Sequence, residues 1–275
     1  MILPDLWLPS RAGLTLTYCG MDSPDKCINP VWFKRYPHSI QYHYNSRGFR
    51  DQEWPQDLSQ VLWCVGDSFT VGLGQPIEHV WPYLLAQRTG QRTVNVSMDG
   101  ASNDWICRVA KSILTEFPQA RIVVHWSYIH RRELSYYAAL CLKFDKMYQA
   151  VKDPSWPQCD WDQYHSLPKA IQQELTDCHG WRPRVYDDDR VVHYVRSTVS
   201  EDCAHIAHCV AQLPPQVTHT SIAHWTPPNT VLSLSQPVIA TPQLDYARDG
   251  HHYGSATSDW LVNQIMQAWA VRAIG

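Results

Sequence analysis

The chain has 275 residues, a formal net charge of −3 and nine cysteines without regular spacing, and 44% of its residues are hydrophobic. This length accommodates one α/β domain with a buried core, and the lack of any cluster of lysine and arginine argues against nucleic acid as a partner. No stretch of about 18 apolar residues is present to span a membrane, and the N-terminus lacks a secretory signal, so we expect a cytoplasmic protein with reduced cysteines.

The first part of the chain, residues 1–60, is rich in proline, aromatic and turn-forming residues. It shows little periodicity, so we interpret it as an irregular arm that lies across a core formed later in the chain. Within it, the segment Asn45–Arg50 predicts a tight turn, because asparagine and glycine tolerate a positive φ angle.

After the arm, strand and helix patterns alternate. Short apolar runs predict buried strands at residues 61–65, 93–97, 121–126, 218–224 and 236–240. Apolar residues at helical spacing predict helices at residues 78–89, 103–116 and 198–212, and a last helix from about Ser255. This alternation indicates βαβ units, and therefore a parallel sheet with helices on both faces.

Residues 131–195 interrupt this alternation. They predict a helix at about 133–151, a loop rich in Trp, Pro and Asp at 153–164, and a short helix near 167–177. We interpret this stretch as an insertion over one edge of the sheet, so that residues 1–275 form a single domain.

The segment Gly66-Asp67-Ser68-Phe69-Thr70 follows the first predicted strand. Binding sites in open α/β sheets lie beyond the carboxyl ends of the strands, which places the Ser68 hydroxyl where a substrate binds. Gly66 permits a sharp exit from the strand, and the backbone N–H of Ser68 can face a developing oxyanion. Thr70 takes the place of the last glycine of the G-x-S-x-G elbow, so the α/β-hydrolase elbow is excluded. The alternative is a glycine turn whose serine caps a helix.

A second polar segment, Asp249-Gly250-His251-His252, lies between the last predicted strand and the last helix. A serine nucleophile needs a base, and a histidine base needs a partner that holds its tautomer. An aspartate three residues before a histidine can supply both groups. The alternative is a polar loop in which Asp249 caps the helix and both histidines are solvated.

Taken together, these segments resemble the SGNH hydrolases, also called GDSL-like lipases and esterases. Gly66–Thr70 is similar to their first sequence block, and the spacing Asp249-x-x-His252 is similar to their last. Met98–Asn103, after the second predicted strand, is similar to the block that carries their oxyanion-hole glycine, which corresponds to Gly100 here.

The resemblance covers about residues 45–126 and 217–270. It includes the turn Asn45–Arg50, which is similar to an N-S-x-G-F-R segment found upstream of G-D-S in one branch of these proteins. It implies a three-layer α/β/α fold with a flavodoxin-like parallel sheet.

The resemblance also implies a serine esterase without a cofactor. It does not specify the substrate, for which our hypothesis is a small-molecule or carbohydrate ester, such as an O-acetylated sugar. Ser68 would be the nucleophile, His252 the base and Asp249 its orienting group, with the N–H groups of Ser68 and Gly100 binding the oxyanion. His251 is the alternative base, but the family spacing favours His252. Two other functions can use this scaffold: a glycan O-acyltransferase with the same triad, and a glycan-binding protein with little catalytic power.

The sequence departs from the family after the third predicted strand, where the family has an asparagine that donates to the oxyanion. The residues here are Ser127, Tyr128, Ile129 and His130. Ser127, Tyr128 or His130 can donate instead, or Asn103 can reach in from the preceding loop. Because one oxyanion donor contributes about 10²–10³ in rate, this departure bears on catalytic power more than on fold.

A group of possible zinc ligands occurs on the helix predicted at 198–212: Cys203, His205, His208 and Cys209. Four ligands from consecutive turns of a single helix cannot surround one ion tetrahedrally. We therefore expect no metal site from this group.

Overall fold

The computed structural model describes residues 6–135, 184–185, 190–194 and 199–274. Its centre is a five-stranded sheet made of β3 (Leu62–Gly66), β4 (Thr93–Ser97), β5 (Arg121–Trp126), β9 (Thr218–Ser221) and β10 (Val238–Ala240). The strand order is β10-β9-β5-β3-β4, and every neighbouring pair is parallel. Numbered along the chain this is the order 2-1-3-4-5, the order of flavodoxin-like sheets.

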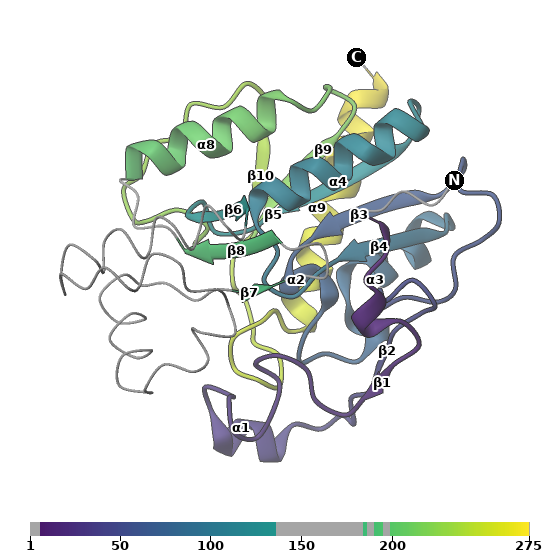
Figure 1. Cartoon of the computed structure of the whole chain (residues 1–275), viewed down its shortest axis with the longest axis vertical. Coiled ribbons are helices and arrows are strands. Elements are labelled where there is room, and N and C mark those ends of the chain that lie inside the picture. Colours follow the sequence, from purple (N-terminus) through teal and green to yellow (C-terminus); the bar gives the residue numbers. More distant parts are fainter. Residues whose placement is uncertain (1–5, 136–183, 186–189, 195–198, 275) are drawn as a thin grey trace, which may run out of the picture.

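Helices cover both faces of this sheet (Figure 1). One face carries α4 (Asn103–Glu116) and α8 (Val199–Ala211), and the other carries α3 (Trp81–Thr89) and α9 (Ser255–Ile274). Because side chains alternate along a strand, Trp63 and Val65 join the core under α4, while Leu62 and Cys64 join the core under α3. The predicted arrangement of a parallel sheet between two helical layers is confirmed.

Helix α3 begins at Trp81, three residues later than the predicted start at residue 78. Residues Ile77–His79 form a separate 3₁₀ turn, and Pro82 lies in the first turn of α3. Proline has no N–H to donate and its ring clashes with the carbonyl four residues earlier, so the helix cannot extend back through residue 78.

In the predicted insertion, β6 (Arg131–Ser135) pairs with β8 (Arg190–Tyr194), which also pairs with β7 (Arg184–Val185). These three strands form one antiparallel sheet in the order β6-β8-β7. The helix predicted from residue 133 is therefore wrong at its first three residues, because their backbone pairs with a distant strand that no local pattern indicates. The rest of that helix, the loop at 153–164 and the helix near 167–177 lie outside the described residues.

The described part of the arm contains short elements: η2 (Pro9–Arg11), β1 (Thr15–Leu16), α1 (Pro30–Arg35) and β2 (Tyr42–His43). Strands β1 and β2 pair with each other in an antiparallel ribbon. Ile40 and Tyr42 are buried against Val71 and Leu73, which follow the first strand of the central sheet. The arm therefore packs on the segment that carries Ser68. Among the described helices, none is both long and apolar enough to cross a membrane.

Candidate active site

Ser68 lies where β3 ends, as the first residue of the short helix α2 (Ser68–Val71). The preceding residue, Asp67, caps this helix: its Oδ1 atom accepts the backbone N–H of Phe69 at 3.0 Å. A side chain at Gly66 would collide with the side chain of Thr70, so only glycine allows the strand to meet the helix this closely. The Ser68 side chain is thereby presented at the carboxyl edge of the sheet.

The loop between β10 and α9 brings its histidine to this serine. The Oγ atom of Ser68 lies 2.8 Å from Nε2 of His252, and Nδ1 of His252 lies 2.5 Å from Oδ2 of Asp249. The other carboxylate oxygen of Asp249 accepts the backbone N–H groups of His251 at 2.9 Å and His252 at 3.0 Å. The side chains of Ser68, His252 and Asp249 are all buried. With Asp249 ionised, Nδ1 carries the imidazole proton and Nε2 is left to accept the proton of Ser68.

The surroundings of His252 adjust its basicity. Burial lowers the pKa of His252, but the charge and hydrogen bond of Asp249, together with the charges of Asp99 and Asp67, raise it above the ordinary 6.5. Burial acts in the opposite direction on Asp249, yet its pKa is lowered because it binds His252 and two backbone N–H groups. The pair is therefore suited to hold a proton on His252 during a reaction.

The neighbouring His251 is in a different position. Its ring lies 5.5 Å from the ring of Phe69, centroid to centroid, and is partly exposed. Burial and the charge of His252 lower the pKa of His251. Of the two candidate bases, His252 is the one hydrogen-bonded to both Ser68 and Asp249.

The loop after β4 lies beside the nucleophile turn, because the N–H of Met98 donates to the carbonyl of Gly66 at 3.2 Å. Gly100 in this loop has a φ of 77°, in the left-handed region that favours glycine. Within the described part of the chain, the backbone N–H groups of Ser68 and Gly100 donate to no protein acceptor. These two donors are those expected to bind an oxyanion.

Asn103, the first residue of α4, binds the loop after β5. Its Oδ1 atom accepts the N–H of Ser127 at 2.9 Å, and its Nδ2 atom donates to the carbonyl of Tyr128 at 2.9 Å. Both ends of the amide are thus engaged with protein groups. Asn103 stabilises the loops around the site, and its role as an oxyanion donor stays a prediction.

The residues after β5 also bind Asp67, a contact that sequence reasoning missed. The hydroxyl of Ser127 donates to Oδ2 of Asp67 at 2.6 Å, and Nη1 of Arg131 donates to the same oxygen at 2.9 Å. Ser127 therefore turns its hydroxyl toward the carboxylate of the nucleophile turn. The carboxylate of Asp67 is completely buried, and a buried charge requires a partner, but nothing in the local sequence shows that Arg131 is that partner.

The turn Asn45–Arg50 has a structural role at the site. The side chain of Asn45 accepts the N–H groups of Arg47 at 3.0 Å and Phe49 at 3.1 Å, which closes the turn as predicted. This turn directs the buried guanidinium of Arg50 toward the end of α2.

The Arg50 guanidinium donates to the carbonyls of Val71 at 3.1 Å, Gly72 at 2.5 Å and Gln75 at 2.7 Å. It also lies over the ring of Tyr42, 4.3 Å from the ring centroid. The arginine therefore donates to carbonyl groups at the end of the helix that carries Ser68 and in the loop that follows it.

The arm also binds the loop that carries Asp249. Arg248 donates to both oxygens of the buried Asp22, from Nε at 2.8 Å and from Nη2 at 2.6 Å. Tyr42 donates to Oδ2 of Asp22 at 2.5 Å, and the N–H of Ile28 donates to the carbonyl of Asp249 at 2.8 Å. The same arm thus holds both halves of the site, the nucleophile turn and the Asp249–His252 loop.

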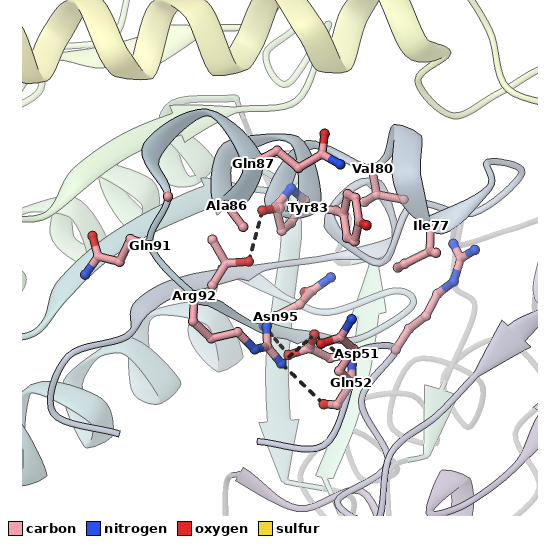
Figure 2. A pocket seen from close by; sticks show the side chains of 14 residues that line it. Asp51, Gln52, Ile77, Val80, Tyr83, Ala86, Gln87, Gln91, Arg92 and Asn95 are labelled. Carbon is pink, nitrogen blue, oxygen red and sulfur yellow. Dashed lines mark hydrogen bonds and ion pairs between the residues drawn. The ribbon is translucent and has the colours of Figure 1, made fainter. Parts of the chain in front are cut away.

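A groove beside the edge strand β4 is lined by Arg50 but by none of the triad residues (Figure 2). In it, Asp51 accepts the backbone N–H of Asn95 at 3.1 Å and pairs with Arg92 at 3.1 Å. An edge strand leaves backbone groups unpaired, and this carboxylate satisfies one of them. We therefore interpret the groove as part of the protection of the sheet edge.

A scan against protein-family models found no match to this chain, and a search of curated proteins found none. The geometry of the residues described above is therefore the basis for assigning a function.

Proposed function

We propose that this chain is a serine hydrolase of the SGNH type that cleaves carboxylic esters. The observation that carries the proposal is the buried, hydrogen-bonded triad of Ser68, His252 and Asp249. In it, Oγ of Ser68 lies 2.8 Å from Nε2 of His252, and Nδ1 of His252 lies 2.5 Å from Oδ2 of Asp249. The five-stranded parallel sheet and the position of Ser68 at its carboxyl edge also support the proposal.

The geometry suits acyl transfer in two steps. In the first, Nε2 of His252 takes the proton of Ser68 as Oγ attacks the ester carbonyl carbon, and Asp249 stabilises the resulting imidazolium. The N–H groups of Ser68 and Gly100 bind the oxyanion of the tetrahedral intermediate. The alcohol then leaves with the proton from His252, and an acyl group remains on Ser68.

In the second step, His252 takes a proton from water, whose oxygen attacks the acyl carbonyl carbon. The acid is released as Ser68 recovers its proton from His252. As substrate we propose a small acyl group, such as acetyl, on a simple or carbohydrate alcohol. If a sugar hydroxyl replaces water in this step, the same residues perform O-acyl transfer.

The test uses the turnover of p-nitrophenyl acetate and butyrate at neutral pH. We expect wild type to hydrolyse at least one ester, and Ser68→Ala to lose activity by a factor on the order of 10⁶, to the detection limit. Ser59→Ala, at an exposed serine of the arm, is the matched control and should keep wild-type turnover. A fluorophosphonate probe followed by peptide mass analysis should label Ser68. Full activity in Ser68→Ala, or wild type that is neither active nor labelled, would contradict the proposal.

A further inference from the structure

Helices α4 and α8 lie side by side on one face of the sheet (Figure 1), and a group of metal-binding side chains faces across them. Asp104 comes from the first turn of α4, and His205 and Cys209 come from α8. Nε2 of His205 lies 3.2 Å from Oδ2 of Asp104 and 3.8 Å from Sγ of Cys209. All three ligand atoms lie within 4.8 Å of one another.

These separations fit a tetrahedral zinc ion. With Zn–S bonds of about 2.3 Å and Zn–N or Zn–O bonds of about 2.0–2.1 Å, tetrahedral angles place nitrogen and oxygen ligands roughly 3.4 Å apart. The same geometry places sulfur and nitrogen ligands roughly 3.6 Å apart. The observed 3.2 and 3.8 Å lie close to these values. The third pair, Asp104 and Cys209, lies within 4.8 Å, so an ion bound to all three residues requires some movement of these side chains.

A further thiol lies near this group on α4, outside the set of three atoms that are within 4.8 Å of one another. Cys107 lies one turn after Asp104, and its thiol donates to the backbone carbonyl of Cys209 at 3.5 Å. Residues three or four positions apart share one helix face, so Asp104 with Cys107 and His205 with Cys209 form two facing pairs. The objection to a zinc site on a single helix therefore does not apply, because two helices supply the ligands.

The surroundings also suit a metal ion. Cys107 and Cys209 are buried, while the side chains of His205 and Asp104 are 18% and 31% exposed. These two residues line an open surface groove through which an ion can enter. The two cysteine thiols are thus shielded from solvent, while the histidine and aspartate ligands face it.

We propose that Asp104, Cys107, His205 and Cys209 bind a divalent ion of the zinc class and so link α4 to α8. Thiolate, imidazole and carboxylate are the ligands that zinc takes in proteins. Each thiol that binds releases its proton to solvent, so binding tightens as the pH rises. The ion would hold the first turn of α4, next to Asn103 and its contacts with the loop after β5. This proposal does not depend on ester hydrolysis.

The test is metal titration of the whole chain, reduced and freed of metal with a chelator. We expect one equivalent of Co²⁺ to produce thiolate-to-cobalt charge-transfer absorption and the visible bands of tetrahedral cobalt, and Zn²⁺ to displace it. In competition with a chromophoric chelator, Cys209→Ser and His205→Gln should each weaken zinc binding by more than about 100-fold, because even outer-shell partners contribute ~10–100-fold. Cys107→Ser should bind cobalt with weaker charge-transfer absorption.

Cys203→Ser is the matched control, since its thiol lies on the same helix but packs against the core outside this group. It should keep the wild-type spectrum and affinity. His205 is partly exposed, so His205→Gln tests the site even if Cys209→Ser does not fold. The proposal is overturned if wild type binds neither ion, or if His205→Gln binds zinc as tightly as wild type does.

Discussion

The ion pair between Asp22 and Arg248 gives the sharpest test of how the arm supports the site. Asp22 is completely buried and the Arg248 side chain is 10% exposed, so solvent screens their interaction little. Breaking a buried pair by removing one partner costs about 3–5 kcal/mol, because the other charge stays buried and uncompensated. Against a total stability of about 5–15 kcal/mol, Asp22→Asn and Arg248→Met should each remain folded but lose much of their stability.

A double-mutant cycle separates the pair from its surroundings. We expect the double variant Asp22→Asn/Arg248→Met to lose about 2–3 kcal/mol less than the sum of the two single losses, because neither charge is left alone. Urea unfolding followed by tryptophan fluorescence gives each free energy of unfolding. Arg88→Met is the control: it breaks the exposed pair with Asp259 and should cost less than about 1 kcal/mol.

The same variants test the link to catalysis. Arg248 directly precedes Asp249, whose carbonyl also accepts a hydrogen bond from the arm residue Ile28. A displacement of Asp249 by about 1 Å can cost on the order of 10²-fold in rate. We expect Asp22→Asn to lower kcat on p-nitrophenyl acetate by about 10–100-fold at nearly constant KM. This link would be refuted if the losses of the two single variants add to that of the double variant within about 0.5 kcal/mol and Asp22→Asn keeps the wild-type kcat.

Three further predictions concern the triad and the nucleophile turn. The pKa of His252 is raised above the ordinary 6.5, and protonated His252 cannot accept a proton. In wild type, kcat/KM should therefore fall as the pH decreases through this pKa. Asp249→Asn removes the group that contributes most to raising this pKa, while the burial that lowers it remains. A pH–rate profile of this variant should show the acidic limb at lower pH and a plateau reduced about 10⁴-fold, and an unmoved limb would speak against the assignment. Arg50→Met removes the guanidinium donor from the carbonyls of Val71 and Gln75, each loss costing about 1–3 kcal/mol, while the carbonyl of Gly72 keeps the N–H of Gln75. Its urea midpoint should therefore drop strongly, and Arg50→Lys should recover part of the loss. Gly66→Ala places a methyl group against Thr70 and should lower the free energy of unfolding by about 1–3 kcal/mol. If this variant unfolds at the same urea concentration as wild type, the turn is not tightly packed.

Local patterns in the sequence were sufficient to predict the central layers. The strands β4 and β5 and the helix α4 have the predicted bounds, because buried strands and amphipathic helices need apolar residues at intervals that are visible along the chain. The G-D-S and D-x-x-H segments could be predicted to meet, since each follows a strand whose carboxyl end lies at the same edge of a parallel sheet. Local patterns misplaced the start of α3 and the strand β6, where a proline and a distant pairing partner decide the structure.

Only the tertiary structure decided which groups neutralise the buried charges. The sequence shows Asp22 and Asp67 without indicating their partners, and the fold supplies Arg248 to the first and Arg131 to the second. The same holds for Asp104 and the ligands of α8, which approach each other only because two helices pack on one face of the sheet. A charge in a buried segment requires a partner, but that partner can come from any part of the chain that folding brings within about 3 Å, and no local periodicity records that choice.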